Sequence, residues 1–104
     1  MKQEDPFRAL ADPTRRAIMD RLRDGPCNVS DLTEALPISQ SAVSQQLGVL
    51  RAAGLVSQKK DGTRRIYSVD GEGFASVRHW VGTYETFWDD GLDRLRTHLA
   101  KGRN

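Results

Sequence analysis

Cysteine is nearly absent from this chain, because Cys27 is the only one among 104 residues. A single thiol can neither close an internal disulfide nor supply a zinc ribbon, which excludes disulfide-stapled secreted domains and cysteine-rich zinc modules. The sequence also has no run of about 18 apolar residues and no charged-then-apolar leader, so we expect neither a membrane span nor a secretory signal. These absences predict a soluble, cytoplasmic protein, and the length predicts one domain over residues 1–104.

Acidic residues are absent from the middle of the chain. No Asp or Glu occurs from residue 35 through residue 60, and residues 35–69 carry five basic side chains against one acidic side chain, a net charge of +4. Residues 70–93 carry six acidic side chains against one basic side chain, a net charge of −5. Since Lys and Arg release counterions from phosphates, the middle is predicted to bind a polyanion, whereas the acidic segment has a different partner.

Helical spacing of apolar residues dominates the first half of the sequence. A short helix precedes a second one that starts at Asp12 and Pro13 and ends before Gly25. A third, short helix is capped by Asn28 or Ser30 and is stopped by Pro37. A fourth helix runs from Ser39 to Ala53 and carries apolar residues at intervals of four and three, Val43, Leu47 and Leu50. The last two helices predict a helix-turn-helix over about residues 28–53.

The pattern changes period after residue 54. Residues 55–69 predict a β-hairpin, or wing, with Lys60, Asp61 and Gly62 in its turn. Helical spacing then resumes and predicts one long helix over about residues 72–100. A helix of about 25 residues spans roughly 38 Å, which is longer than a domain of this size needs internally. The predicted fold class is therefore mostly α with a small β-hairpin: a winged helix-turn-helix with a long C-terminal dimerisation helix.

Three segments, in this order, resemble one protein family. The segments ALADPTRRAIMDRL, SQSAVSQQLGVLRAAGLV and KKDGTRRIYSV look like the corresponding segments of the ArsR-type (arsenical-resistance repressor-like) bacterial transcription regulators. The resemblance covers residues 6–70 and, more loosely, the tail. It implies a dimeric DNA-binding repressor in which the helix matching residues 39–53 lies in the major groove. It also implies that the hairpin reaches flanking DNA and that the first and last helices form the dimer interface.

The residue types support this placement. Off its apolar stripe, the helix over residues 39–53 carries mainly hydroxyl and amide groups, which can hydrogen-bond base edges, and no carboxylate that phosphate would repel. The neighbouring hairpin carries basic side chains suited to phosphate or the minor groove. A solvated helix face and an ordinary charged turn are the alternatives for the two segments taken alone. The predicted DNA-binding residues are Ser39, Gln40, Ser41, Ser44, Gln45, Arg51, Lys59, Lys60, Arg64 and Arg65.

The apolar stripe of the last helix is too long and too broad for one subunit to cover. We therefore predict a homodimer built on the first helix and the last one. The residues predicted at its interface are Phe7, Leu10, Phe74, Val77, Val81, Tyr84, Trp88, Leu92 and Leu95. The same aromatic residues could instead line a small-molecule pocket, so an inducer is left open.

The sequence departs from the metal-sensing members of the family it resembles. Those members carry a Cys-Val-Cys-Asp-Leu box at the start of the third helix, whereas Asn28 and Ser30 stand at the two cysteine positions here and Cys27 comes one residue too early. One displaced thiol cannot supply the three or four ligands of a zinc or arsenite site. His79 and His98 are interpreted as surface residues. We predict no metal ligand, no cofactor and no response to metals, and the alternative is a site shared between the last helices of two subunits.

Three alternatives to a simple repressor remain. Cys27 and His79 could form a catalytic pair, but no oxyanion or phosphate loop accompanies them, so no enzyme is predicted. A winged helix can also serve as a protein-interaction adaptor without specific DNA binding. The third alternative is a repressor that responds to a ligand or to oxidation, for instance through Cys27.

Overall fold

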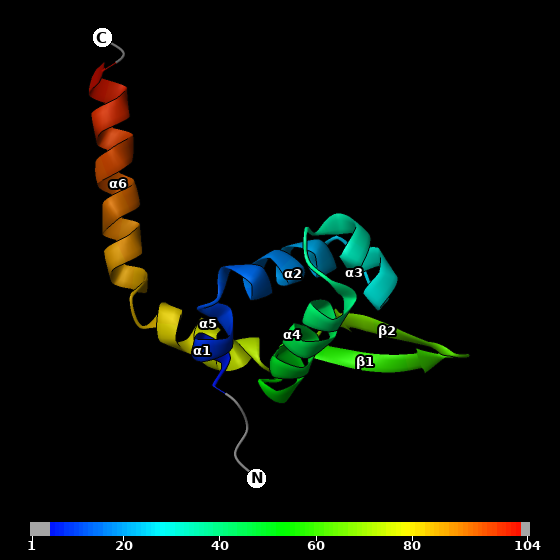
Figure 1. Ribbon diagram of the computed structural model, residues 1–104. Coiled ribbons are helices and arrows are strands. Elements are labelled where there is room, and N and C mark those ends of the chain that lie inside the picture. Colours follow the sequence, from blue (N-terminus) through cyan, green and yellow to red (C-terminus); the bar gives the residue numbers. More distant parts are fainter. Residues whose placement is uncertain (1–4, 103–104) are drawn as a thin grey trace.

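The computed structural model describes residues 5–102 and contains helices with one small sheet. The elements follow one another as shown in Figure 1: α1 (Pro6–Leu10), α2 (Pro13–Arg23), α3 (Val29–Ala35), α4 (Gln40–Ala52), β1 (Val56–Asp61), β2 (Arg64–Val69), α5 (Phe74–Gly82) and α6 (Glu85–Gly102). This is the predicted mostly helical fold with a hairpin wing. Within the described residues, no helix has both the length and the apolar composition needed to cross a bilayer.

Side-chain caps fix where four of the helices begin, and the Asp5 carboxylate caps α1. The Asp12 carboxylate accepts a hydrogen bond from the Arg15 backbone N–H at 3.0 Å and starts α2. Asn28, rather than Ser30, caps α3 in a reciprocal capping box with Asp31. The Ser39 hydroxyl accepts from the Ala42 backbone N–H at 3.1 Å and starts α4. Each cap satisfies a backbone donor that the first turn of a helix would otherwise leave unpaired.

The hydrophobic core lies between α1, α2, α3, α4 and the base of the wing. The predicted apolar stripe of α4 is fully buried there, with Val43, Leu47 and Leu50 each 0% exposed. The other buried hydrophobic residues are Ala9, Ile18, Met19, Leu22, Cys27, Leu32, Ala53, Leu55, Val56 and Tyr67. Because one face of α4 is held in this core, its opposite face is directed to solvent.

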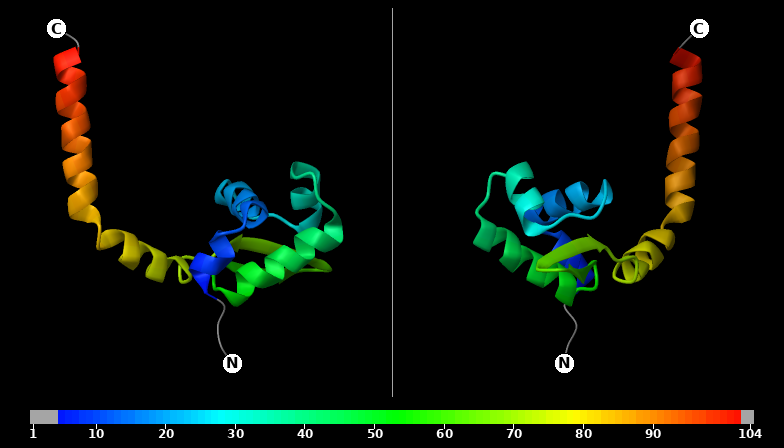
Figure 2. Two further views of the ribbon diagram at one scale, coloured as in Figure 1. Left: turned by 60° about the vertical axis from the view of Figure 1, so that its left-hand side comes forward. Right: turned by 90° about the vertical axis from the view of Figure 1, so that its right-hand side faces the viewer.

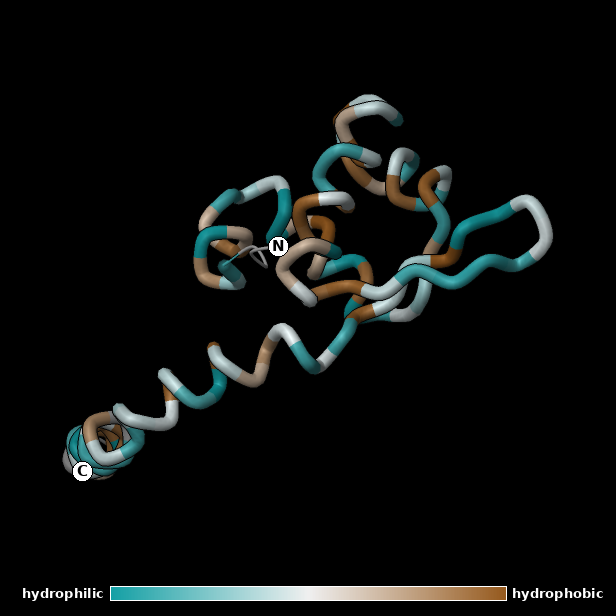
Figure 3. Tube along the Cα trace, turned by 90° about the horizontal axis from the view of Figure 1, so that it is seen from below, coloured by the Kyte–Doolittle hydropathy of each residue, from teal (hydrophilic) through white to brown (hydrophobic). Residues whose placement is uncertain are grey.

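The wing is an antiparallel hairpin whose register runs from Val56 opposite Val69 to Asp61 opposite Arg64. Its turn is one residue further along than predicted: Lys60 and Asp61 belong to β1, and Gly62 with Thr63 connects the strands. Gly62 has φ +65°, as the first central position of a two-residue turn with primed geometry requires. In Figure 3 the wing is mostly hydrophilic and only its base, next to the helices, is hydrophobic.

The predicted single helix over residues 72–100 is wrong in one respect, because the chain turns at residues 83–84, called the elbow below. There the Tyr84 backbone N–H donates to the Val81 carbonyl at 3.0 Å, and the Thr83 hydroxyl donates to the Trp80 carbonyl at 2.7 Å. Gly82 and Thr83 are poor helix formers, and a threonine hydroxyl competes for backbone acceptors. The long C-terminal helix is therefore present as α6, and α5 is a separate element.

The helix α6 stands clear of the rest of the subunit (Figures 1 and 2). The described chain measures 61 × 34 × 22 Å with a Cα radius of gyration of 18.0 Å, whereas a compact domain of about 100 residues has a radius near 13 Å. The first four and last two residues of the predicted domain, and the side chain of Trp88, lie outside the described residues.

Candidate nucleic-acid interface

The exposed face of α4 is formed by Gly48 and by the residues predicted to read DNA. Ser41, Ser44, Gln45 and Gly48 follow one another at helical spacing and are all exposed, opposite the buried stripe. Gln40 and Arg51 flank this face at the two ends of the helix and are exposed as well. Ser39, the sixth predicted residue, is exposed, and its hydroxyl caps α4. The face is therefore polar, free of carboxylates and held on a helix whose other side is locked in the core.

Small and amide side chains keep this face open to a partner. Ser44 and Gln45 make no side-chain hydrogen bond to any other described residue, so their donors and acceptors face solvent. The next glutamine behaves differently: Gln46 is half-buried and accepts a hydrogen bond from Arg15 at 2.9 Å. A glutamine can pair with adenine through two hydrogen bonds in the major groove, and a serine can serve several bases.

The wing places its basic residues beyond the core. Lys59, Lys60, Arg64 and Arg65 are all exposed. Lys60 lies directly opposite Arg65 across the hairpin, whereas Arg64 lies opposite Asp61. Like charges facing each other across two strands destabilise a hairpin, and a bound anion removes that repulsion. The Lys60 and Arg65 pair therefore has the electrostatics of a phosphate-binding position, while Arg64 has a carboxylate across from it.

A hollow of about 350 Å³ joins the wing to the helix-turn-helix. Arg64, Arg65 and Thr63 of the wing lie on one side of it, and Gln40 of α4 with Asn28 and Ser30 of α3 on the other. Three of the predicted DNA-binding residues, Gln40, Arg64 and Arg65, are thus brought to one surface. The contributions of Thr63 and of the start of α3 were missed, because the sequence does not show how close α3 comes to the wing.

The thiol of Cys27 belongs to the core and not to this surface. Cys27 is 1% exposed, and its backbone pairs with that of Tyr67 in β2 through hydrogen bonds of 3.0 and 2.8 Å. Its S–H group donates to the Gly25 carbonyl at 3.4 Å. Burial raises the pKa of the Cys27 thiol, and the nearby charge of Arg21 opposes this only in part. The group is therefore a neutral, inaccessible thiol.

No metal centre is evident within residues 5–102, where no three His, Cys, Asp or Glu side chains come together at a point that could hold an ion. Asn28 and Asp31, which stand in the segment matching the metal box, use their side chains to cap α3. His79 and His98 are both exposed, on α5 and α6 respectively.

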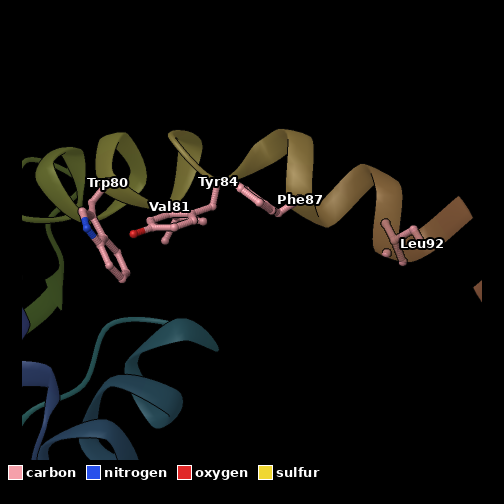
Figure 4. A pocket seen from close by; sticks show the side chains of 6 residues that line it. Trp80, Val81, Tyr84, Phe87 and Leu92 are labelled. Carbon is pink, nitrogen blue, oxygen red and sulfur yellow. The ribbon is translucent and has the colours of Figure 1, made fainter. Parts of the chain in front are cut away.

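A second surface, formed by α1, α5 and α6, is apolar. Phe7 of α1 meets Trp80 of α5 edge to face with ring centroids 5.7 Å apart, and Tyr84 continues this stack to Phe87 over 5.2 and 6.1 Å. A hollow of about 500 Å³ lies along it, and the side chains of Trp80, Tyr84 and Leu92 project from one side of the ribbon in Figure 4. We call this surface the apolar face; its exposed members are Phe7, Trp80, Val81, Tyr84, Phe87, Leu92, Leu95 and Leu99.

The residues predicted at a dimer interface divide between this face and the core. Phe7, Val81, Tyr84, Leu92 and Leu95 belong to the apolar face, each between 39% and 53% exposed. Val77 is half-buried on α5, and Leu10 and Phe74 are half-buried and packed against the core, so less of their surface is available. Trp88 lies within α6, but its side chain is outside the described residues.

These features define the class of protein as a winged helix-turn-helix transcription regulator. Residues 12–58, which span α2 through the middle of β1, match the protein family described as "Bacterial regulatory protein, arsR family". The chain is 46% identical over 86 residues to HTH-type transcriptional regulator Rv2034 of Mycobacterium tuberculosis, a stretch covering 83% of this chain and 78% of that protein. The chain belongs to the ArsR family of bacterial transcription regulators.

Two further similarities agree with this family. The transcriptional repressor SdpR of Bacillus subtilis is 30% identical over 86 residues, which cover 83% of this chain and 96% of that protein. A crystal structure named "Possible transcriptional regulator for arsenical resistance" is 43% identical with a TM-score of 0.69, covering 88% of this chain and 92% of that one.

Proposed function

We propose that the protein is a homodimeric repressor that blocks a promoter by placing one α4 helix of each subunit in the major groove. The observation that carries this proposal is the exposed face of α4, which presents hydroxyl and amide groups and no carboxylate next to a basic wing. Such a repressor acts in the bacterial cytoplasm, where the DNA is, and needs no catalytic activity.

The apolar face supports the dimer. Phe87 is 72% exposed, and the three leucines of α6 are between 52% and 57% exposed. A contiguous apolar surface of this kind marks an interaction site, and a two-fold dimer buries the same patch on both subunits. Two subunits then present two α4 helices to two half-sites about one helical turn of DNA apart, roughly 34 Å.

We assign base contacts and phosphate contacts to different elements. We assign base reading to Ser44 and Gln45, whose side chains are exposed and engaged in no hydrogen bond with another described residue. We assign phosphate binding to Arg65 and Lys60, since a phosphate would relieve the repulsion between these two opposed cations. Phosphate contacts orient a protein on the duplex, whereas contacts to base edges determine which sequence it prefers.

The test begins with an operator selected from a random duplex pool, followed by affinity measurements for that operator and for a scrambled duplex at several salt concentrations. Gln45→Ala should lose discrimination at one base pair per half-site, at a cost of about 1 to 3 kcal/mol. Arg65→Ala should weaken binding to both duplexes and lower the salt slope by about one unit per contact, or about two per dimer.

Matched variants guard against effects on folding or on net charge. Gln58→Ala removes an amide from β1, outside the α4 face, and Arg23→Ala removes an exposed cation from α2; both should bind as the native protein does. If Gln45→Ala weakens both duplexes equally while Arg65→Ala changes neither, the assignment of α4 and the wing is wrong. If the native protein binds no duplex even at low salt, the chain is a protein-interaction adaptor instead.

A further inference from the structure

One side chain connects three of the helices. Arg15 of α2 donates from Nε to the Ala9 carbonyl at 2.6 Å and from Nη2 to the Arg8 carbonyl at 3.3 Å, both in α1. Its remaining nitrogen, Nη1, donates to Oε1 of Gln46 in α4 at 2.9 Å. The guanidinium is half-buried, planar and fixed by three hydrogen bonds, so the relative placement of these helices is constrained at this point.

The bonds to α1 and the bond to α4 do separate tasks. The last carbonyls of a helix lack partners within it, and a cation at that end is favourable. Arg16 helps in the same way, donating from Nη1 to the Leu10 and Ala11 carbonyls at 2.9 and 3.1 Å. Arg16 has no hydrogen bond to α4 among the described residues, whereas Arg15 does. The contact with Gln46 therefore adds something beyond capping α1.

The two ends of this connection are the two surfaces described above. On its far side α1 presents Phe7, which stacks against Trp80 in the apolar face. On α4, Gln46 directly follows Gln45, and neighbouring residues in a helix point about 100° apart around its axis. A rotation or tilt of α4 that breaks the Arg15 to Gln46 bond thus also moves the side chain assigned to reading bases.

We propose that the Arg15–Gln46 hydrogen bond is a positioning link that sets the orientation of α4 relative to the dimerisation surface. The inference rests on the proposed function, because it assumes that the apolar face joins two subunits and that α4 reads DNA. In a dimer, the angle between these surfaces determines the distance between the two α4 helices. The link therefore enforces the preferred spacing of the half-sites and makes no contact with a base.

The decisive variants alter only the α4 end of the link. Gln46→Met keeps the length of the side chain but removes the acceptor, and Gln46→Glu keeps an acceptor for the guanidinium. Arg16→Met is the matched control, because it removes bonds to α1 that do not reach α4. Each protein is measured for its unfolding midpoint, its mass in solution and its affinity for the selected operator, for operators lengthened or shortened by one base pair, and for a scrambled duplex.

Gln46→Met should remain a folded dimer and should lose about three- to tenfold in affinity for the selected operator, a loss typical of altered coupling between sites. Its preference over the respaced operators should shrink, while binding to the scrambled duplex stays within about twofold. Gln46→Glu and Arg16→Met should keep the native spacing preference. These outcomes together separate positioning from general stability.

Two results would contradict the proposed positioning role of the Arg15–Gln46 hydrogen bond. One is a Gln46→Met protein with the native spacing preference, and the other is equal loss on operator and scrambled duplex. A failure of the proposed function looks different, because the native protein itself would then show no preference for the selected operator or would sediment as a monomer.

Discussion

Gly48 is an unusual residue for the middle of a helix. It lies on the exposed face of α4 between Gln45 and Arg51, and a Cβ atom added there would meet nothing within 4 Å. Glycine in a helix interior is less favourable than alanine by about 1 kcal/mol. Nothing in the described part of the subunit compensates this cost, so we expect the explanation for the missing side chain to lie in what approaches α4 from outside.

We expect Gly48→Ala to affect stability and binding in opposite directions. The free energy of unfolding should rise by about 0.5 to 1 kcal/mol, because alanine restricts the unfolded backbone. Affinity for the selected operator should fall, because the added methyl group projects from the face that the duplex approaches. Chemical denaturation and operator titration of the same preparation measure both effects, and a more stable protein with undiminished affinity would contradict a close approach of DNA at Gly48.

Cys27 should react slowly in the folded protein and quickly once it is unfolded. Burial keeps the thiol from reagents and raises its pKa, so at neutral pH little of the nucleophilic thiolate is present. Labelling with an aromatic disulfide reagent, with and without denaturant, gives the two rates. Cys27→Ser should leave the response of operator binding to oxidants unchanged. Fast labelling of the native protein would instead support a redox switch at Cys27.

The raised pKa of Cys27 also predicts that the stability of the fold depends on pH. Below the ordinary cysteine pKa of about 8.5 the thiol is neutral in both states, and its burial carries no charge penalty. Above that value the unfolded chain loses the proton while the folded one, with its raised pKa, retains it. The contribution of Cys27 to stability should therefore decline as the pH rises through the alkaline range, and Cys27→Ser should remove this component from the pH profile of unfolding.

The structural role of a residue could be predicted from the sequence where that role depends only on neighbouring residues. The helix starts predicted at Asp12 and Ser39 are both confirmed, because each residue caps its helix and capping depends on the next three residues only. Gln46 could not be separated from Gln45, because its partner Arg15 lies 31 positions away. For the same reason the sequence did not place Cys27 beside Tyr67 in the core.

At the scale of the elements, the junction between the wing and α5 depends on two glycines. The Gly73 backbone N–H donates to the Gly54 carbonyl at 2.8 Å, and a Cβ on Gly73 would overlap that carbonyl group. Gly54 itself has φ +73° just beyond the end of α4. The end of α4 and the start of α5 therefore touch through their backbones.

We expect Gly73→Ala to destabilise the fold by about 1 to 3 kcal/mol, because the methyl group forces two backbone segments apart. Gly71→Ala is the matched control: it stands two residues earlier, has open space around the position of its Cβ and should change stability little. Urea unfolding monitored by circular dichroism measures both. Equal stability of the two variants would mean that the backbones at Gly54 and Gly73 can move apart without lowering the free energy of unfolding.

The C-terminal helices show that the spacing of apolar residues does not predict where a helix is interrupted. Apolar residues keep helical spacing through residues 74–99, yet the chain turns at the elbow, since hydrogen bonds around Thr83 replace the regular ladder. The spacing reports which side of the chain is apolar and not whether the helix is continuous. The wing turn also differs from the prediction, because the pairing between the strands extends through Lys60 and Asp61.

At the scale of the whole molecule, the apolar face predicts the oligomeric state. The native protein should sediment at twice the subunit mass of 11.6 kDa. Phe87→Asp should dissociate it, because a carboxylate replaces a ring that is 72% exposed in one subunit and would be buried between two. Thr86→Asp places the same charge one residue earlier, also at an exposed position of α6, and should remain dimeric.

Dissociation should also abolish preference for the operator, since each half-site alone binds weakly and the linked pair multiplies the two affinities. The measurement is sedimentation together with operator titration at micromolar concentration. A native monomer, or a Phe87→Asp protein with unchanged mass, would remove the basis for the proposed dimer.

In the proposed dimer, the elbow would allow the preferred base sequence and the spacing of the half-sites to change independently. The 18 residues of α6 extend about 27 Å from it, so a bend of only about 10° displaces the far end by about 5 Å. In the proposed dimer, substitutions at residues 83–84 would therefore shift one DNA-reading helix relative to the other without altering any atom of α4. A lineage of such proteins could acquire operators with a new distance between unchanged half-sites, or new half-sites at an unchanged distance, through mutations in different elements.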